Sequence, residues 1–196
     1  MSGGLGTRMQ VQDFARYDID PALCRFSIKV VAEGFLSAMG HNPTISARDV
    51  SGEVRFASAA LDQAFLRITI RPESFEVTGD ASPKDKLEIE TKMKQEVLET
   101  SRYPEIVFES SSISLSKTGD EGYMVNLTGN LSLHGATRPQ TINCQATVND
   151  ETIRGFGEFS VRQTEYGIKL VSVAGGMLKV KDEVKCSFEI IARKRA

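Results

Sequence analysis

The chain has 196 residues, a hydrophobic fraction of 40% and a charged fraction of 26%, a globular composition that fits one domain. Lys and Arg (24) nearly balance Asp and Glu (26), so a net charge of −2 argues against bulk attraction to nucleic acid or an acidic membrane. The N-terminal segment has no apolar run typical of a signal peptide or a membrane span, which predicts a cytoplasmic protein, or a periplasmic one if a signal was removed. We expect residues 1–14 to be a flexible tail and residues 15–194 to form a single domain.

Apolar and polar residues alternate with a period of two from residue 17 almost to the end of the chain, which is typical of antiparallel strands with one dry face. We predict about eight strands joined mostly by short turns rich in Gly, Asn and Asp. The segment 123–133 keeps one parity across Gly129, so we expect a long strand bent at this glycine, followed by a turn at ATRP (136–139). The alternating segments are 26–30, 54–56, 66–70, 106–108, 113–115, 123–133, 141–148, 159–161 and 184–190.

The stretch from Ser82 to Glu99 follows a helical period instead. Ser82 is a suitable N-cap, Pro83 suits the first helical position, and Asp85 completes a pair that resembles a capping box. We expect one helix over about residues 83–99, which either packs on the sheet or covers one end of a barrel. Its apolar side is formed by Ile89, Met93 and Val97, with Leu87 and Leu98 beside them.

A sheet of about eight strands with one apolar face has to bury that face. It can pack two sheets together, or it can close into a barrel and so remove its edges. An eight-stranded barrel is either filled by its own side chains or holds one small ligand. With 10 Phe and no Trp, the apolar face could form either a packed core or an apolar tunnel. The alternation by itself therefore leaves both choices open.

Six ordered segments between residues 17 and 192 resemble motifs of the YceI-like family, the lipocalin-like proteins that bind polyisoprenoids. The segments are YDIDPALCRFSI, SGEVRF, RITIRPESFEVTGDASPKD, SRYPEIVFESS, GNLSLHGATRPQTI and RQTEYGI. The chain departs from the family pattern at Leu23 and at about Val30, where histidines are usual, and at DKLE (85–88), where the family has D-x-H-L. The resemblance implies an all-β fold, an elongated antiparallel eight-stranded lipocalin-like β-barrel with one main helix. It also implies a homodimer and a long isoprenoid chain in the barrel lumen.

A polyprenyl tail offers only apolar surface, and its burial yields roughly 25 cal/mol per Å², so it suits a long dry tunnel. Strand parity predicts which side chains would line that tunnel, although each also suits ordinary core packing. They are Phe26, Ile28, Val30, Val54, Phe56, Leu66, Ile68, Phe108, Val125, Leu127, Leu131, Leu133, Ile142, Phe159, Val184 and Phe188, with Met93 and Val97 from the helix.

Few residues suggest catalysis or a metal site. His41 lies in a GHNP turn and His134 falls on the polar face, and we expect neither to bind a metal. Cys24, Cys144 and Cys186 have no CxxC spacing, so we expect inert thiols rather than disulfides, metal ligands or nucleophiles.

Arg138 and Arg162 are candidates for holding a phosphate or carboxylate head group at the barrel mouth, and each also suits a solvated charge. The sequence thus predicts a protein without cofactor or catalytic activity that carries or stores a polyisoprenoid or an isoprenoid-tailed quinone precursor. Its partner would be a long-chain isoprenoid or fatty lipid, with no nucleic acid and no transmembrane segment. The alternatives are an interaction or structural domain with a filled core, and an enzyme that acts on a lipid head group.

Overall fold

The computed structural model describes residues 14–33, 43–56, 63–173 and 178–195. Residues 1–13 of the expected N-terminal tail (1–14) and His41 lie outside these ranges. In chain order the elements are β1 (Ala15–Ile19), β2 (Arg25–Lys29), β3 (Ala32–Glu33), β4 (Thr44–Ala47), β5 (Val50–Phe56), β6 (Phe65–Ile70), η2 (Pro72–Ser74), β7 (Phe75–Thr78), α1 (Pro83–Lys92), η3 (Met93–Val97), β8 (Ile106–Lys117), β9 (Gly122–Leu133), β10 (Ala136–Val148), β11 (Thr152–Arg162), η4 (Gln163–Tyr166), β12 (Ser172–Val173), β13 (Leu178–Val180) and β14 (Glu183–Lys194).

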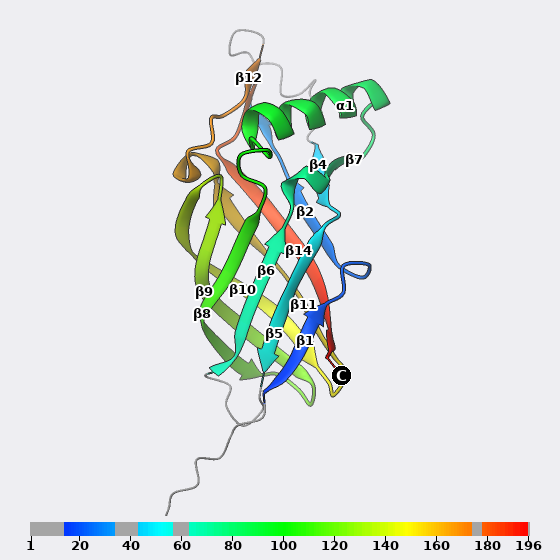
Figure 1. Ribbon diagram of the computed structural model, residues 1–196, viewed down its shortest axis with the longest axis vertical. Coiled ribbons are helices and arrows are strands. Elements are labelled where there is room, and N and C mark those ends of the chain that lie inside the picture. Colours follow the sequence, from blue (N-terminus) through cyan, green and yellow to red (C-terminus); the bar gives the residue numbers. More distant parts are fainter. Residues whose placement is uncertain (1–13, 34–42, 57–62, 174–177, 196) are drawn as a thin grey trace, which may run out of the picture.

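Eight antiparallel strands close into a barrel in the order β1-β5-β6-β8-β9-β10-β11-β14, with β1 paired back to β14. The last strand, β14, is long enough to take two partners along the edge opposite β11: it pairs with β1 near Ala192 and with β2 near Phe188. From β2 the sheet continues through β4 to β7. The expected eight-stranded barrel is confirmed, and the sandwich alternative is wrong. Figure 1 shows the elongated barrel with α1 across one end and the C-terminus near the other.

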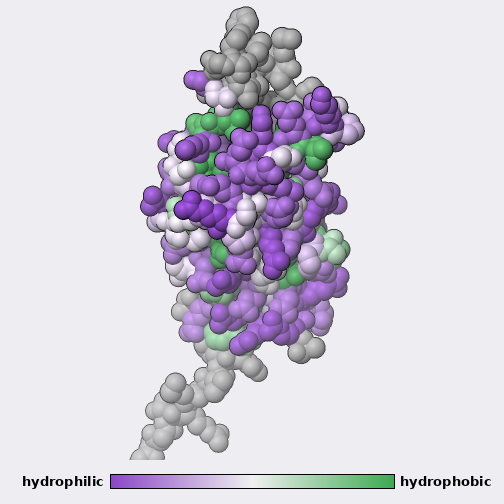
Figure 2. Space-filling model, turned by 45° about the horizontal axis from the view of Figure 1, so that its top comes forward, coloured by the Kyte–Doolittle hydropathy of each residue, from purple (hydrophilic) through white to green (hydrophobic). Residues whose placement is uncertain are grey.

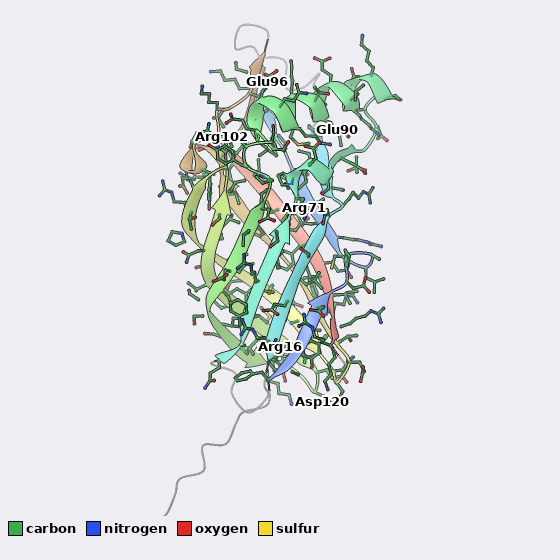
Figure 3. The ribbon with its side chains drawn as sticks, in the orientation of Figure 1. Arg16, Arg71, Glu90, Glu96, Arg102 and Asp120 are labelled. Atoms are coloured by element: carbon green, nitrogen blue, oxygen red, sulfur yellow. The ribbon has the colours of Figure 1, made fainter. Side chains whose placement is uncertain are left out.

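Apolar side chains lie on the inner face of the barrel wall and polar side chains on the outer face, as the alternation predicts. On β9, Val125, Leu127 and Leu131 are buried inside, whereas Asn130 is exposed outside. The surface seen in Figure 2 is mainly hydrophilic, with apolar patches close to the helix end. Charged side chains such as Arg16 and Asp120 project outward in Figure 3. The apolar side chains are thus left to face the lumen.

The strand β8 replaces two strands that the sequence suggested. The sequence suggested separate strands at 106–108 and 113–115, because the apolar parity changes between them. The structure has one strand whose pairing with β9 is irregular between Ser110 and Ser112. An extra residue at a bulge reverses the side-chain parity without ending the strand, so both apolar segments of β8 face inward.

The turn between β9 and β10 also differs from the expectation. The ATRP segment belongs to β10, and Leu133 pairs with Ala136, which leaves a loop of only His134 and Gly135. Both loop residues have positive φ, 50° and 76°, as a type I′ hairpin requires. Glycine supplies this conformation without strain, whereas the histidine adopts it within a set of contacts described below.

The helix begins as predicted and ends differently. The Ser82 hydroxyl accepts a hydrogen bond from the Asp85 backbone N–H at 3.2 Å, and Pro83 takes the first position. Regular α-helix ends at Lys92 and continues as the π-helical turn η3 to Val97, short of the expected residue 99. The Glu99 backbone then has a φ of +46°, so the chain turns away toward β8. This helical unit lies over the end of the barrel (Figure 1).

Candidate functional site

A cavity of about 620 Å³ occupies the inside of the barrel. All eighteen side chains predicted from parity and the helical stripe lie on its wall. On β9 the wall runs from Leu133 to Val125, which corresponds to about 26 Å of extended strand. The cavity is therefore long as well as apolar.

Sequence reasoning missed a second set of wall residues on the same inward parity. Most of them lie on the apolar parity of segments whose alternation was recognised, but they were not named as tunnel residues. Ile45 and Phe75 belong to β4 and β7, which were not predicted. They include Ile45, Ile70, Phe75, Ile106, Ile113, Leu115, Cys144, Ala146, Val148, Ile153, Gly155, Val161, Cys186, Ile190 and Ala192. The parity of each full strand was the signal that could have identified them.

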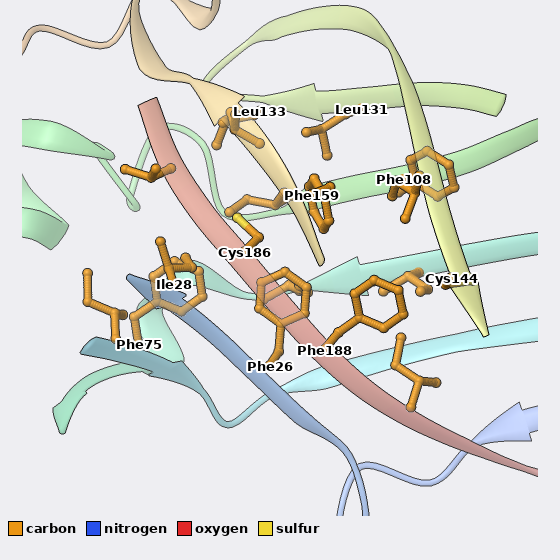
Figure 4. A pocket seen from close by; sticks show the side chains of 18 of the residues that line it. Phe26, Ile28, Phe75, Phe108, Leu131, Leu133, Cys144, Phe159, Cys186 and Phe188 are labelled. Carbon is orange, nitrogen blue, oxygen red and sulfur yellow. The ribbon is translucent and has the colours of Figure 1, made fainter. Parts of the chain in front are cut away.

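Three of the phenylalanines on the wall, Phe26, Phe159 and Phe188, pack against one another (Figure 4). The ring centroids of Phe26 and Phe159 are 6.4 Å apart in an edge-to-face arrangement, and those of Phe159 and Phe188 are 6.3 Å apart. These rings come from the adjacent strands β2, β14 and β11. Such pairs are favourable beyond the area they bury, so they hold the rings in place on one side of the lumen.

Small residues keep another part of the lumen open. Gly155 on β11 lies between Ala146 on β10 and Ile190 on β14, and all three contribute to the cavity wall. The nearest atom to a β-carbon built at Gly155 is the Gln145 carbonyl oxygen at 3.9 Å, so its missing side chain leaves free space. The next inward residue, Gly157, differs, because its β-carbon would lie 2.7 Å from that of Cys144.

The helical unit closes the end of the cavity through Ile89, Met93, Val97 and Leu98. The expectation for Leu87 was wrong: it is 67% exposed and does not reach the cavity, because it lies on the opposite side of α1. The reading of the helix as a cover for one barrel end is therefore supported by its contacts.

The cover is attached by side-chain hydrogen bonds near its C-terminal end. The Glu90 carboxylate accepts a bond from the Val77 backbone N–H at 2.7 Å, and the Thr100 hydroxyl donates to Glu73 at 2.6 Å. The α-helical part, α1, has no buried residue, whereas Met93 in η3 is buried. The helical unit is thus held more firmly at η3 than at its N-terminus.

The two arginines proposed as head-group ligands lie outside the cavity wall. Arg138 is exposed, and its Nε donates to the Glu165 carbonyl oxygen at 3.2 Å. Arg162 is also exposed and lies near Asp182, whose pKa is lowered chiefly by hydrogen bonds from Thr164 and, to a smaller extent, by the Arg162 charge. The charged residues on the wall are instead Asp85, Glu88, Lys92 and Lys179, all from elements at the helix end.

The cysteines are free thiols in protected positions. Burial raises the pKa of Cys144 to about 11 and that of Cys186 to about 12, so both wall thiols are protonated at neutral pH. Cys24 is half-buried away from the wall, where its sulfur accepts a hydrogen bond from the Ile191 backbone N–H at 3.3 Å. Burial is also the main cause that raises the pKa of Cys24. A protonated thiol is a weak nucleophile.

His134 is not the surface residue that the sequence suggested. Only 10% of its side chain is exposed, and its Nε2 lies 2.9 Å from a Glu99 carboxylate oxygen. Its Nδ1 donates to the Tyr166 carbonyl oxygen at 3.2 Å, and its ring packs on Tyr103 at a centroid distance of 4.4 Å. The ring lies outside the cavity wall, as its parity requires, and ties the end of the helical unit to the β9–β10 turn.

We expect His134→Ala to lower the free energy of unfolding by about 2 kcal/mol, because it removes two hydrogen bonds and an aromatic contact at a strained turn. His134→Asn should cost about half as much, because asparagine accepts positive φ readily. Urea denaturation of both variants measures the difference. A cost below about 0.5 kcal/mol for His134→Ala would show that these contacts add little stability.

A metal centre finds no support in the part of the chain that is described. Within residues 14–33, 43–56, 63–173 and 178–195, no three His, Cys, Asp or Glu side chains gather as a metal site. His41 lies outside these ranges, so the pairing of His41 with His134 is not described. Among the same residues, no helix combines the length and apolar character needed to cross a bilayer.

An antiparallel barrel that encloses a long apolar cavity beneath a helix defines the lipocalin-like class of barrels. The chain belongs to the YceI family: the model of the YceI-like domain matches residues 17–192. A search of curated proteins finds no match.

Solved structures share the fold at low sequence identity. BcnA of Burkholderia cenocepacia is 20% identical with a TM-score of 0.66, over 88% of this chain and 98% of that one. A polyisoprenoid binding domain from Saccharophagus degradans, described as implicated in plant cell wall breakdown, is 13% identical with a TM-score of 0.67, over 91% and 98%. The YCEI protein of Campylobacter jejuni is 14% identical with a TM-score of 0.58, over 80% and 88%.

Proposed function

We propose that this protein binds a long-chain apolar lipid, an isoprenoid or an isoprenoid-tailed quinone precursor, inside the barrel and carries or stores it unchanged. The observation that carries the proposal is the continuous apolar cavity of about 620 Å³. Water molecules find almost no hydrogen-bond partners on such a wall. An apolar chain, by contrast, leaves water and makes close van der Waals contacts there. The description of the Saccharophagus degradans neighbour as polyisoprenoid binding agrees with this ligand class.

The cavity volume limits the size of the ligand. A cavity of ~150 Å³ takes up one benzene molecule, so a cavity four times larger accommodates on the order of 25 carbon atoms. The wall follows about 26 Å of β9, which suits an extended chain better than a compact ring system. A prenyl chain of about four or five isoprene units therefore fits inside the cavity, and a longer chain would extend beyond it.

The alternatives have less support. A completely filled core does not agree with a cavity of this size. An enzyme that acts on a head group would need a nucleophile or a general acid–base pair at the wall. The wall thiols Cys144 and Cys186 are protonated at neutral pH, and His134 lies outside the wall. The carboxylate and ammonium groups of the wall are confined to the helix end, where Lys92 and Glu88 form an ion pair. Transport or storage without chemical change needs no catalytic side chain beyond the apolar wall itself.

Two measurements on protein purified without detergent test the proposal. Mass spectrometry of an organic extract should reveal a prenyl or fatty species in stoichiometric amount. After delipidation, geranylgeraniol at 100 times its Kd should stabilise the fold by about 2.7 kcal/mol and raise Tm by roughly 5–10 °C. An empty extract, together with no thermal shift from prenyl alcohols or fatty acids, would contradict the proposal and favour an interaction domain.

A further inference from the structure

The charged side chains on the cavity wall have no net charge, because their positive and negative charges are equal in number. The helix α1 contributes Asp85, Glu88 and Lys92, and β13 contributes Lys179. Lys92 and Glu88 lie one helical turn apart with an N–O distance of 3.6 Å, so this cation already has an anionic neighbour. Two carboxylates and two ammonium groups leave this end of the cavity without net charge, whereas an anionic head group requires an excess of positive charge.

The N-terminus of α1 could attract an anion, but its own side chains already satisfy it. The Ser82 hydroxyl accepts a hydrogen bond from the Asp85 backbone N–H at 3.2 Å and donates to the Asp85 carboxylate at 2.7 Å. A carboxylate in the first turn also interacts favourably with the helix dipole. An incoming phosphate would therefore compete with Asp85 and be repelled by it.

Among the described residues, Lys92 and Lys179 are the only Lys or Arg side chains on the cavity wall. Arg138 and Arg162 lie outside the wall. The segments 34–42 and 174–177, which are adjacent in sequence to β3, β12 and β13, contain one histidine, His41, and neither Lys nor Arg. The remaining uncharged polar side chain on the wall is Gln163 of η4, whose Nε2 donates to the Lys181 carbonyl oxygen at 2.9 Å. With its amide nitrogen engaged, Gln163 offers an oxygen that can accept a hydrogen bond from a hydroxyl group but would repel an ionised oxygen.

We infer that the bound lipid carries an uncharged polar head, such as an alcohol, phenol or quinone, at the α1 end of the cavity, and that phosphate, diphosphate and carboxylate heads are disfavoured. This inference rests on the proposed function, because it concerns the head of a lipid held in that cavity. The wall disfavours the anion through its balanced charges and through the carboxylates of Asp85 and Glu88, which line the α1 end where we place the head group.

Two ligands with the same chain test the inference: geranylgeraniol and geranylgeranyl diphosphate, each titrated against a fluorescent apolar probe bound to the delipidated protein. We expect the alcohol to bind at least tenfold more tightly than the diphosphate, which corresponds to about 1.4 kcal/mol. A diphosphate that binds equally well or better would overturn the inference and leave the proposed function intact. If neither compound displaces the probe, both the inference and the isoprenoid proposal fail.

A charge reversal on the wall provides a matched pair of variants. Glu88→Lys should strengthen diphosphate binding at least fivefold and leave alcohol binding within twofold, and added salt should reduce the gain. Glu96→Lys is the control, because it makes the same change in net charge on η3 but lies outside the wall (Figure 3). An equal gain in both variants would show that net charge, not the wall, controls head-group preference, and would overturn the inference. Glu88→Gln, which should give a smaller gain, repeats the test if the lysine variant folds poorly.

Discussion

Gly155→Phe is expected to weaken the binding of an apolar ligand at least 100-fold while the barrel stays folded. The β-carbon enters free space, since its nearest neighbour would be the Gln145 carbonyl oxygen at 3.9 Å. The ring then occupies the lumen between Ala146 and Ile190, where the proposed lipid would lie. Filling an empty apolar cavity should leave the free energy of unfolding unchanged or raise it by about 1 kcal/mol. Probe displacement measures the first effect, and urea denaturation measures the second.

The matched control for this variant is Glu158→Phe, on the same strand but on the outer face, where Glu158 is exposed. It adds the same ring without entering the cavity, so ligand affinity should stay within about twofold. Normal affinity in Gly155→Phe would place the ligand outside the lumen and contradict the proposed function. Loss of affinity in both variants would indicate a general effect on the strand β11. The experiment would then not support binding of the ligand in the lumen.

Gly129→Ala is expected to lower the free energy of unfolding by about 3 kcal/mol, because the added methyl group has no space. A β-carbon there would lie 2.3 Å from the Glu109 carbonyl oxygen and 2.9 Å from the Ser110 Cα, both in the backbone of β8. It would also lie 2.8 Å from the ring of Phe108, which belongs to the cavity wall. Backbone atoms cannot rotate away as a side chain can, so the two strands have to separate locally.

Gly119→Ala provides the comparison, because a β-carbon at Gly119 meets no atom within 4 Å. Its effect on the free energy of unfolding should stay within about 0.5 kcal/mol. The same urea titration, followed by circular dichroism, serves both variants. A small effect at Gly129 would mean that β8 and β9 can move apart at the bulge without loss of stability.

The strand pattern was predictable because each strand of a barrel has one face toward the lumen and one toward water. This rule assigned Leu131 and Leu133 to the lumen and His134 to the other side. It failed at β8, because a bulge near Ser111 changes the parity and the sequence does not mark the extra residue. The helical stripe likewise failed at Leu87, because this residue lies two positions before Ile89 in α1 and therefore on the exposed side of the helix.

The contacts around His134 could not be predicted from the sequence, for a different reason. Glu99, Tyr103 and Tyr166 are 31 to 35 positions away from His134 in the sequence, and no local period relates them to it. The same limit applies to the charged residues of the wall. Asp85 and Lys179 come from distant segments, and only closure of the barrel brings them to one cavity.

By itself the sequence determined that this protein consists of antiparallel strands with one apolar face and one helix, and it determined which side chains share that face. Both follow from local periods, since each depends on the alternation of neighbouring residues or on a helical stripe. Only the tertiary structure decided that the apolar faces leave a cavity of about 620 Å³ instead of a filled core. That outcome depends on how far apart the walls stand and on small residues such as Gly155 and Ala146, which pair across strands. The balance of charge at the α1 end is likewise a product of closure, because it adds groups that only the folded barrel brings together.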